Sequence, residues 1–148
     1  MMRITSLAFS QDEEIPKQYT CDGENINPPL TIDGVPAEAE SLALIVEDPD
    51  VPNGTFAHWL LWNLEPQTLE IEEGNTPEDA VIGENSAGEV NYIGPCPPAG
   101  THNYYFKLYA LDTMLELASG ATREELIKAL EPHILETAEL VGKYTKQL

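Results

Sequence analysis

The fold of this chain is decided by residues 41–64, Ser-Leu-Ala-Leu-Ile-Val-Glu-Asp-Pro-Asp-Val-Pro-Asn-Gly-Thr-Phe-Ala-His-Trp-Leu-Leu-Trp-Asn-Leu. Two apolar runs of strand length flank a turn that holds two aspartates. Pro49 and Pro52 fix φ at two positions of this turn and remove two backbone donors. We therefore expect a stiff loop that carries Asp48 and Asp50 where a buried strand surfaces; its prolines are also where a cis peptide bond is least costly. The alternative is an ordinary solvated turn, which Asp, Pro, Asn and Gly also favour.

Most of the remaining chain also has extended patterns. Period-two or β-branched runs predict further strands at Ile4–Phe9, Ile15–Thr20 (weak, because Pro16 interrupts it), Leu30–Ile32, Leu69–Glu72 and Asn103–Leu111. In the last of these, a period of two places His102, Tyr104, Phe106 and Leu108 on one face. The segment from Gly74 to Gly100 is rich in glycine and proline and predicts a long irregular connection.

Helical periodicity begins only late in the chain. Thr122 and Glu125 form the pattern of a capping box, and Leu126, Ile127 and Leu130 form an apolar stripe that ends before Pro132. The segment Ile134–Tyr144 fits helix or strand, and we favour a terminal strand from about Glu139. The sequence therefore predicts one mostly β domain over residues 1–148, a β-sandwich with one or two late helices.

Composition excludes several partners. The chain has 148 residues, with 7 basic and 26 acidic side chains and a formal net charge of −19. Such a field opposes nucleic acids and anionic lipid surfaces, and no apolar run is long enough for stable membrane insertion. The amino terminus lacks the apolar core of a secretion signal, so we expect a cytoplasmic protein.

Cys21 and Cys96 are the two cysteines of the chain, and they form no CxxC pair. In a cytoplasmic protein we expect free thiols. A disulfide between them is the second interpretation, and a zinc site of two cysteines and two histidines is the third.

Several motifs together resemble one known family. They are Thr20-Cys-Asp-Gly-Glu-Asn25, Asp48-Pro-Asp-Val-Pro52, His58-Trp59, Gly83-Glu-Asn-Ser86 and Tyr92-Ile-Gly-Pro-Cys-Pro-Pro-Ala-Gly-Thr-His102. In this order they resemble the phosphatidylethanolamine-binding protein family, specifically its bacterial and archaeal branch, often called Raf kinase inhibitor-like proteins. The resemblance covers essentially the whole chain. It implies a Greek-key β-sandwich of two antiparallel sheets with a small helical appendage.

The resemblance also implies a small anion pocket for phosphate-like groups. Carried over residue by residue, its wall is Asp48, Pro52, His58, Pro98, His102 and Tyr104, with Asp50 supporting the loop. The residue chemistry is compatible, because two protonated histidines can donate to an anion, and the tyrosine adds a neutral donor. A carboxylate beside a phosphate fits if it orients a histidine or shares a proton with the ligand.

The resemblance thus implies a non-enzymatic binding protein without a cofactor, whose ligand is phosphorylethanolamine or a phospholipid head group and whose role is regulatory. The alternative is an inhibitor of a peptidase or kinase that acts through the loops around the pocket, and the family implies a homodimer. We rank two enzyme hypotheses lower. A hydrolase built on Ser86 lacks the GxSxG elbow, and a metal site made of Asp48, Asp50, His58 and His102 lacks a paired ligand motif.

Overall fold

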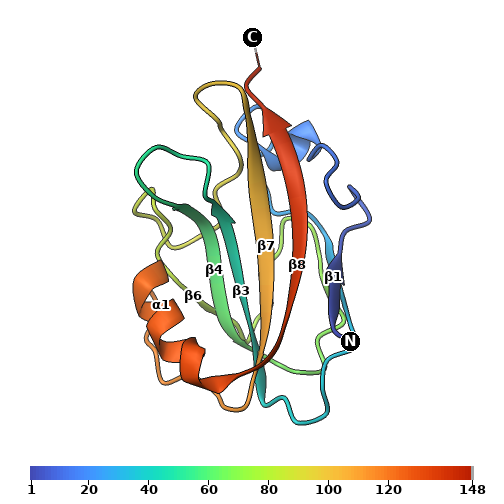
Figure 1. The fold of residues 1–148 in the computed structure, drawn as a ribbon, viewed down its shortest axis with the longest axis vertical. Coiled ribbons are helices and arrows are strands. Elements are labelled where there is room, and N and C mark those ends of the chain that lie inside the picture. Colours follow the sequence, from blue (N-terminus) through green and yellow to red (C-terminus); the bar gives the residue numbers. More distant parts are fainter. Residues whose placement is uncertain (148) are drawn as a thin grey trace.

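The computed structural model describes residues 1–147 and contains two antiparallel sheets with one short α-helix late in the chain (Figure 1). This confirms the predicted fold class. The small sheet has the strand order β1-β2-β5, and the large sheet has the order β6-β4-β3-β7-β8. In chain order the elements are β1 (Arg3–Thr5), η1 (Lys17–Tyr19), β2 (Leu30–Asp33), β3 (Ser41–Asp48), β4 (Phe56–Leu64), β5 (Glu70–Ile71), β6 (Val81–Ile82), β7 (Thr101–Leu111), α1 (Arg123–Leu130), η2 (Glu131–His133) and β8 (Ile134–Thr145).

The central strand β3 is covered on both faces, which explains why its sequence is an unbroken apolar run. Leu42, Leu44 and Val46 belong to the core between the two sheets. Ala43 and Ile45 face the other way and join a second core, which includes residues of α1. A strand with two buried faces has no exposed side to carry alternating polar residues.

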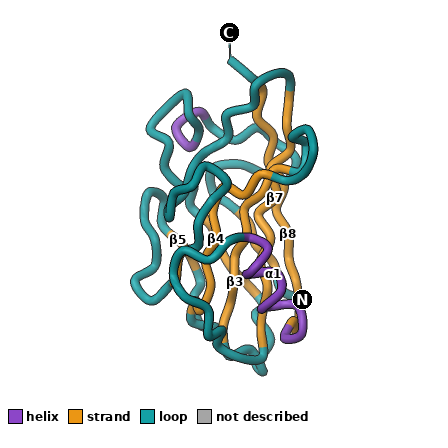
Figure 2. Tube along the Cα trace, turned by 90° about the vertical axis from the view of Figure 1, so that its left-hand side faces the viewer, coloured by secondary structure: helices purple, strands orange, loops and turns teal. Residues whose placement is uncertain are grey.

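The carboxyl-terminal third of the chain agrees closely with its sequence pattern. Thr122 caps α1, and its hydroxyl and the Glu125 carboxylate form the reciprocal bonds of a capping box. β8 pairs with β7 from Thr101↔Thr145 to Leu111↔Ile134, so the ambiguous segment is a strand and begins earlier than Glu139. Figure 2 shows that helix is confined to η1 near one end of the molecule and to α1 with η2 toward the other. Within residues 1–147, no helix has the length and hydropathy needed to cross a bilayer.

Three local expectations are wrong. Residues 17–19 form a 3₁₀ turn instead of a strand, because the backbone N–H groups of Tyr19 and Thr20 bond to the carbonyls of Pro16 and Lys17. The amino-terminal strand ends at Thr5 and does not reach Phe9; the Ser6 hydroxyl donates to the Pro29 carbonyl there. All peptide bonds of the described residues are trans, so the proline-rich turn contains no cis bond.

The two cysteines are not free thiols. Cys21 and Cys96 form a disulfide, with a Cα–Cα distance of 5.5 Å. Their positions are 75 residues apart in sequence. The cysteine prediction rested on the expected compartment, whereas the fold places the loop after η1 against the loop before β7, as the bond from the Cys21 N–H to the Pro95 carbonyl shows.

Candidate functional site

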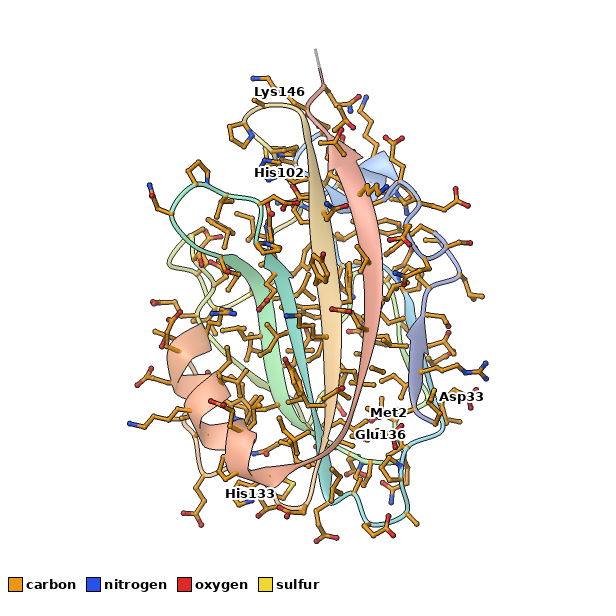
Figure 3. All side chains as sticks on the ribbon, in the orientation of Figure 1. Met2, Asp33, His102, His133, Glu136 and Lys146 are labelled. Atoms are coloured by element: carbon orange, nitrogen blue, oxygen red, sulfur yellow. A yellow bond between two sulfur atoms is a disulfide. The ribbon has the colours of Figure 1, made fainter. Side chains whose placement is uncertain are left out.

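A pocket of about 370 Å³ lies where β3 ends and where β4 and β7 begin. Four of the predicted residues line it, namely Asp48, His58, Pro98 and Tyr104. The three strands pair side by side in the large sheet, which brings residues from distant parts of the sequence to one end of the molecule. Figure 3 shows His102 at this end, together with Lys146, and His133 at the opposite end.

A β-bulge places His58 in the pocket. Val46 pairs with Trp59, but the next residue of β3, Glu47, pairs with Ala57, so His58 is the extra residue on β4. Strict alternation would send His58 to the face opposite that of Trp59. The bulge breaks the alternation: Ala57 belongs to the α1 core, while His58 lines the pocket. Bulges next to binding sites commonly re-aim a side chain in this way.

The hydrogen bonding of His58 fixes its tautomer. Its Nδ1 lies 2.7 Å from the Ile93 carbonyl oxygen, which can only accept, so Nδ1 carries a proton. Burial lowers the pKa of His58, although the Ile93 carbonyl and the Asp48 carboxylate act in the opposite direction. In the free protein at neutral pH the ring is therefore neutral, and its Nε2 is an acceptor; among residues 1–147 the ring's hydrogen bond is made through Nδ1.

Asp48 connects the pocket to His102. Its Oδ2 lies 2.6 Å from His102 Nδ1, and both side chains are almost fully buried. Its Oδ1 accepts the backbone N–H of Asp50 at 2.8 Å, which closes the turn after β3. Asp50 in turn accepts from the backbone and side-chain N–H groups of Asn103, at 2.7 and 3.1 Å. These bonds tie the turn after β3 to the first residues of β7.

Two predicted wall residues do not line the pocket. His102 lies behind Asp48, and Pro52 is exposed while its neighbour Val51 faces the pocket. Sequence reasoning missed six lining residues: Val51, Phe56, Ile93, Gly94, Cys96 and Pro97. Four of these lie in the Ile93–Pro97 stretch of a motif we had quoted, so the motif indicated the segment without showing which of its side chains face inward.

The walls are mostly aromatic and aliphatic. The His58 ring lies between Phe56, at a centroid distance of 4.8 Å, and Tyr104, whose ring meets it edge-on at 5.3 Å. Burial, with the nearby carboxylates of Asp48 and Asp50, raises the pKa of Tyr104, so its phenol remains a neutral donor. Of the described residues that line the pocket, Asp48 is the one acidic residue, and none is lysine or arginine.

Ser86, on which the hydrolase hypothesis rests, lies outside the pocket that Asp48 and His58 line. Ser86 lines a different hollow, with Arg123 and Glu124, and its Oγ accepts the backbone N–H of Ala57. Within residues 1–147, no group of three or more His, Cys, Asp or Glu side chains is arranged to hold a metal ion.

A concave pocket with a few polar groups between apolar walls is typical of a small-molecule binding site, and here it lies at one end of a β-sandwich. The chain belongs to the phosphatidylethanolamine-binding protein family, whose model matches residues 5–145. It is 48% identical to a UPF0098 protein of Methanothermobacter thermautotrophicus, over 98% of this chain and 99% of that one. A UPF0098 protein of Chlamydia muridarum is 51% identical, over 97% of this chain and 98% of its own length.

Two crystal structures share the fold over nearly the full length. CT736 of Chlamydia trachomatis, a proposed phosphatidylethanolamine-binding protein homolog, superimposes with a TM-score of 0.94 at 49% identity, covering 99% of this chain and 98% of its own. YbcL of E. coli, described as a new member of the mammalian family, superimposes with a TM-score of 0.93 at 28% identity, covering 99% of each chain. The resemblance seen in the sequence motifs is thereby confirmed at the level of family and fold.

Proposed function

We propose that this protein binds, without catalysis, a small phosphate-bearing ligand such as phosphorylethanolamine or a phospholipid head group. The phosphate lies in the pocket between Asp48, His58 and Tyr104. The observation that carries this proposal is the pairing of a buried Asp48–His102 bond with a neighbouring His58 whose Nε2 is free. A purely structural histidine has both ring nitrogens satisfied more often than one left open to a cavity.

The pocket favours binding of an anion together with a proton, carried either by the anion itself or by His58. His58 is neutral in the free protein, and Asp48 is a carboxylate, so a fully ionised phosphate would meet an acceptor and a like charge. Protonation of His58 turns Nε2 into a donor and supplies a positive charge beside the phosphate. This modifies our first expectation of two imidazolium donors: His58 contacts the ligand, and His102 acts through Asp48.

The apolar walls set the size and kind of ligand. A volume of about 370 Å³, bounded by Phe56, Val51 and Pro98, accommodates a head group but not a folded peptide segment. An alkyl portion, such as the two carbons of ethanolamine, packs against the aromatic rings. A cationic amine would find Asp48 and the ring faces favourable.

Calorimetric titration with inorganic phosphate and with O-phosphorylethanolamine, from about pH 5.5 to about 8, tests the proposal. Affinity should rise as the pH falls. His58→Ala should weaken binding by about 1.5–3 kcal/mol, because a charge-assisted hydrogen bond is lost. His102→Ala should weaken it through the disturbed Asp48, and Ser86→Ala, in the other hollow, is the matched control that should change little. Affinity that is flat with pH and indifferent to both histidines would refute the proposal.

A second measurement separates binding from inhibition of a protein partner. The purified protein is added to a panel of peptidases and kinases with and without O-phosphorylethanolamine. We expect that any inhibition disappears once O-phosphorylethanolamine saturates the pocket. Inhibition that depends on residues 49–55 but not on His58 would favour the inhibitor hypothesis instead.

A further inference from the structure

The disulfide between Cys21 and Cys96 is part of the pocket wall, because Cys96 lines the pocket itself. We propose that this disulfide is a redox switch for ligand binding. The oxidised form holds the wall formed by Cys96, Pro97 and Pro98 against the pocket, and reduction releases it. This inference rests on the proposed function, since it concerns regulation of the same site.

The wall has little else to hold it in place. On its amino-terminal side, Gly94 donates to the Asn25 side chain, and the Pro95 carbonyl accepts from Cys21. On its carboxyl-terminal side, the Gly100 carbonyl accepts from Lys146. Among the described residues, no hydrogen bond involves residues 96–99.

The sequence explains this lack of hydrogen bonds. Pro97 and Pro98 have no backbone N–H and so cannot join a neighbouring strand or loop as donors. Pro97 is buried and contributes apolar contact, but Cys96, Pro98 and Ala99 are exposed. The covalent bond to Cys21 is therefore the main attachment of the wall.

The disulfide is accessible to a reductant. Cys21 and Cys96 are both exposed, and they line an outer hollow of about 240 Å³ together with Asp22 and Lys146. Lys146 lies at this end of the molecule in Figure 3. Exposed disulfides are the ones that cellular thiols reduce most readily, whereas structural ones are buried and inert.

The reductant is a dithiol, whether a small molecule or a protein. One of its thiolates attacks the sulfur of Cys21 or Cys96 and expels the other sulfur as a thiolate, which leaves a mixed disulfide. Its second thiol then attacks that mixed disulfide. The protein gains two electrons and two protons as two cysteine thiols, and the reductant becomes a disulfide.

Reduction should change the wall without unfolding the sheets. Neither cysteine belongs to the two apolar cores, most of whose members lie on β-strands. Asp48, His58 and Tyr104 lie on β3, β4 and β7, whose ladders do not involve the disulfide. The polar groups of the pocket therefore stay in place while its outer side opens.

Calorimetric titration of O-phosphorylethanolamine into the full chain, oxidised or reduced with dithiothreitol, tests the switch. If the released wall is in its binding position about a tenth of the time, reduction weakens apparent affinity about tenfold. The double variant C21S/C96S should bind like the reduced protein and be unaffected by dithiothreitol. Ser86→Ala, which keeps the disulfide, should respond to dithiothreitol as the wild type does.

A ligand-independent measurement makes the outcome decisive. Reduction should shift or broaden the amide NMR signals of Ala99 and Gly100 and leave those of β3 and β7 unchanged. Equal affinity of both redox forms, or unmoved signals at Ala99 and Gly100, overturns the switch. Loss of the sheet signal in far-ultraviolet circular dichroism on reduction overturns it too, because the effect is then unfolding. If the oxidised protein does not bind O-phosphorylethanolamine, the proposed function is refuted even if reduction moves the NMR signals of Ala99 and Gly100. The proposal that the disulfide controls binding is then refuted as well.

Discussion

Replacing Asp48 by alanine should destabilise the protein through two lost hydrogen bonds. The carboxylate bonds to His102 Nδ1 at 2.6 Å and accepts the Asp50 N–H at 2.8 Å. The first is a buried charge-assisted bond, for which about 1.5–3 kcal/mol is typical, and the second contributes about 1 kcal/mol. His102 also loses its partner while it stays buried, so we expect a total loss of about 3–5 kcal/mol in the free energy of unfolding.

Asp48→Asn is a milder substitution at the same position. An amide oxygen can still accept the Asp50 N–H, but the charge opposite His102 is gone, so the expected loss is about half as large. His102→Ala and the double variant complete a double-mutant cycle with Asp48→Ala. The coupling energy between the two positions should be about 1.5–3 kcal/mol.

Guanidinium unfolding followed by tryptophan fluorescence measures these values, because Trp59 and Trp62 are both fully buried and report on loss of the cores. Asp50→Asn serves as control: Asp50 is exposed and should cost about 1 kcal/mol or less. A loss below about 1 kcal/mol for Asp48→Ala, or independent effects of Asp48 and His102 in the cycle, would show that this pair does not hold the turn.

Three further predictions concern charge and capping. Because burial holds the pKa of His58 below its ordinary value of 6.5, the free protein should lose stability as pH falls from about 6.5 through the lowered pKa. Thermal melts should show this loss in the wild type and its reversal by added phosphate, whereas His58→Ala should show neither the loss nor the reversal. Glu47 is buried, but its hydrogen bonds from Arg123 and Lys107 outweigh burial and hold its pKa down; Glu47→Gln should cost about 1–2 kcal/mol in urea unfolding and leave phosphate affinity unchanged. Thr122→Ala removes the cap of α1 and should cost about 1 kcal/mol in the same assay, and no loss would mean that the capping box adds nothing.

The sequence by itself was sufficient for features that depend on neighbouring residues. The unbroken apolar run of β3, the two-residue period of β7 and the capping box at Thr122 each follow from local preferences, and each is found where its pattern lies. Glu139 was a late estimate for the start of β8 because residues 134–138 alternate weakly. Their strand state comes from pairing along β7. Family membership also followed from motifs that span most of the chain.

Only the tertiary structure decided the arrangement of the pocket. His58 reaches it because the ladder of β3 and β4 contains an extra residue, and such a bulge depends on two strands rather than on one. Val51 lines the pocket where Pro52 was expected, and His102 bonds to Asp48 without lining the pocket. The turn is held in this arrangement by the bond from the Asn103 N–H, on the neighbouring strand, to the Asp50 carboxylate.

The disulfide is a second feature that the tertiary structure decided and the sequence did not. Two cysteines 75 positions apart can be free or bonded, and the compartment expected from the sequence favoured free thiols. The outcome is set by where the fold places two loops, through contacts such as that between Cys21 and the Pro95 carbonyl. Local preference acts over a few residues, whereas the pocket and its covalent wall are made by contacts between segments that meet only after the strands have paired.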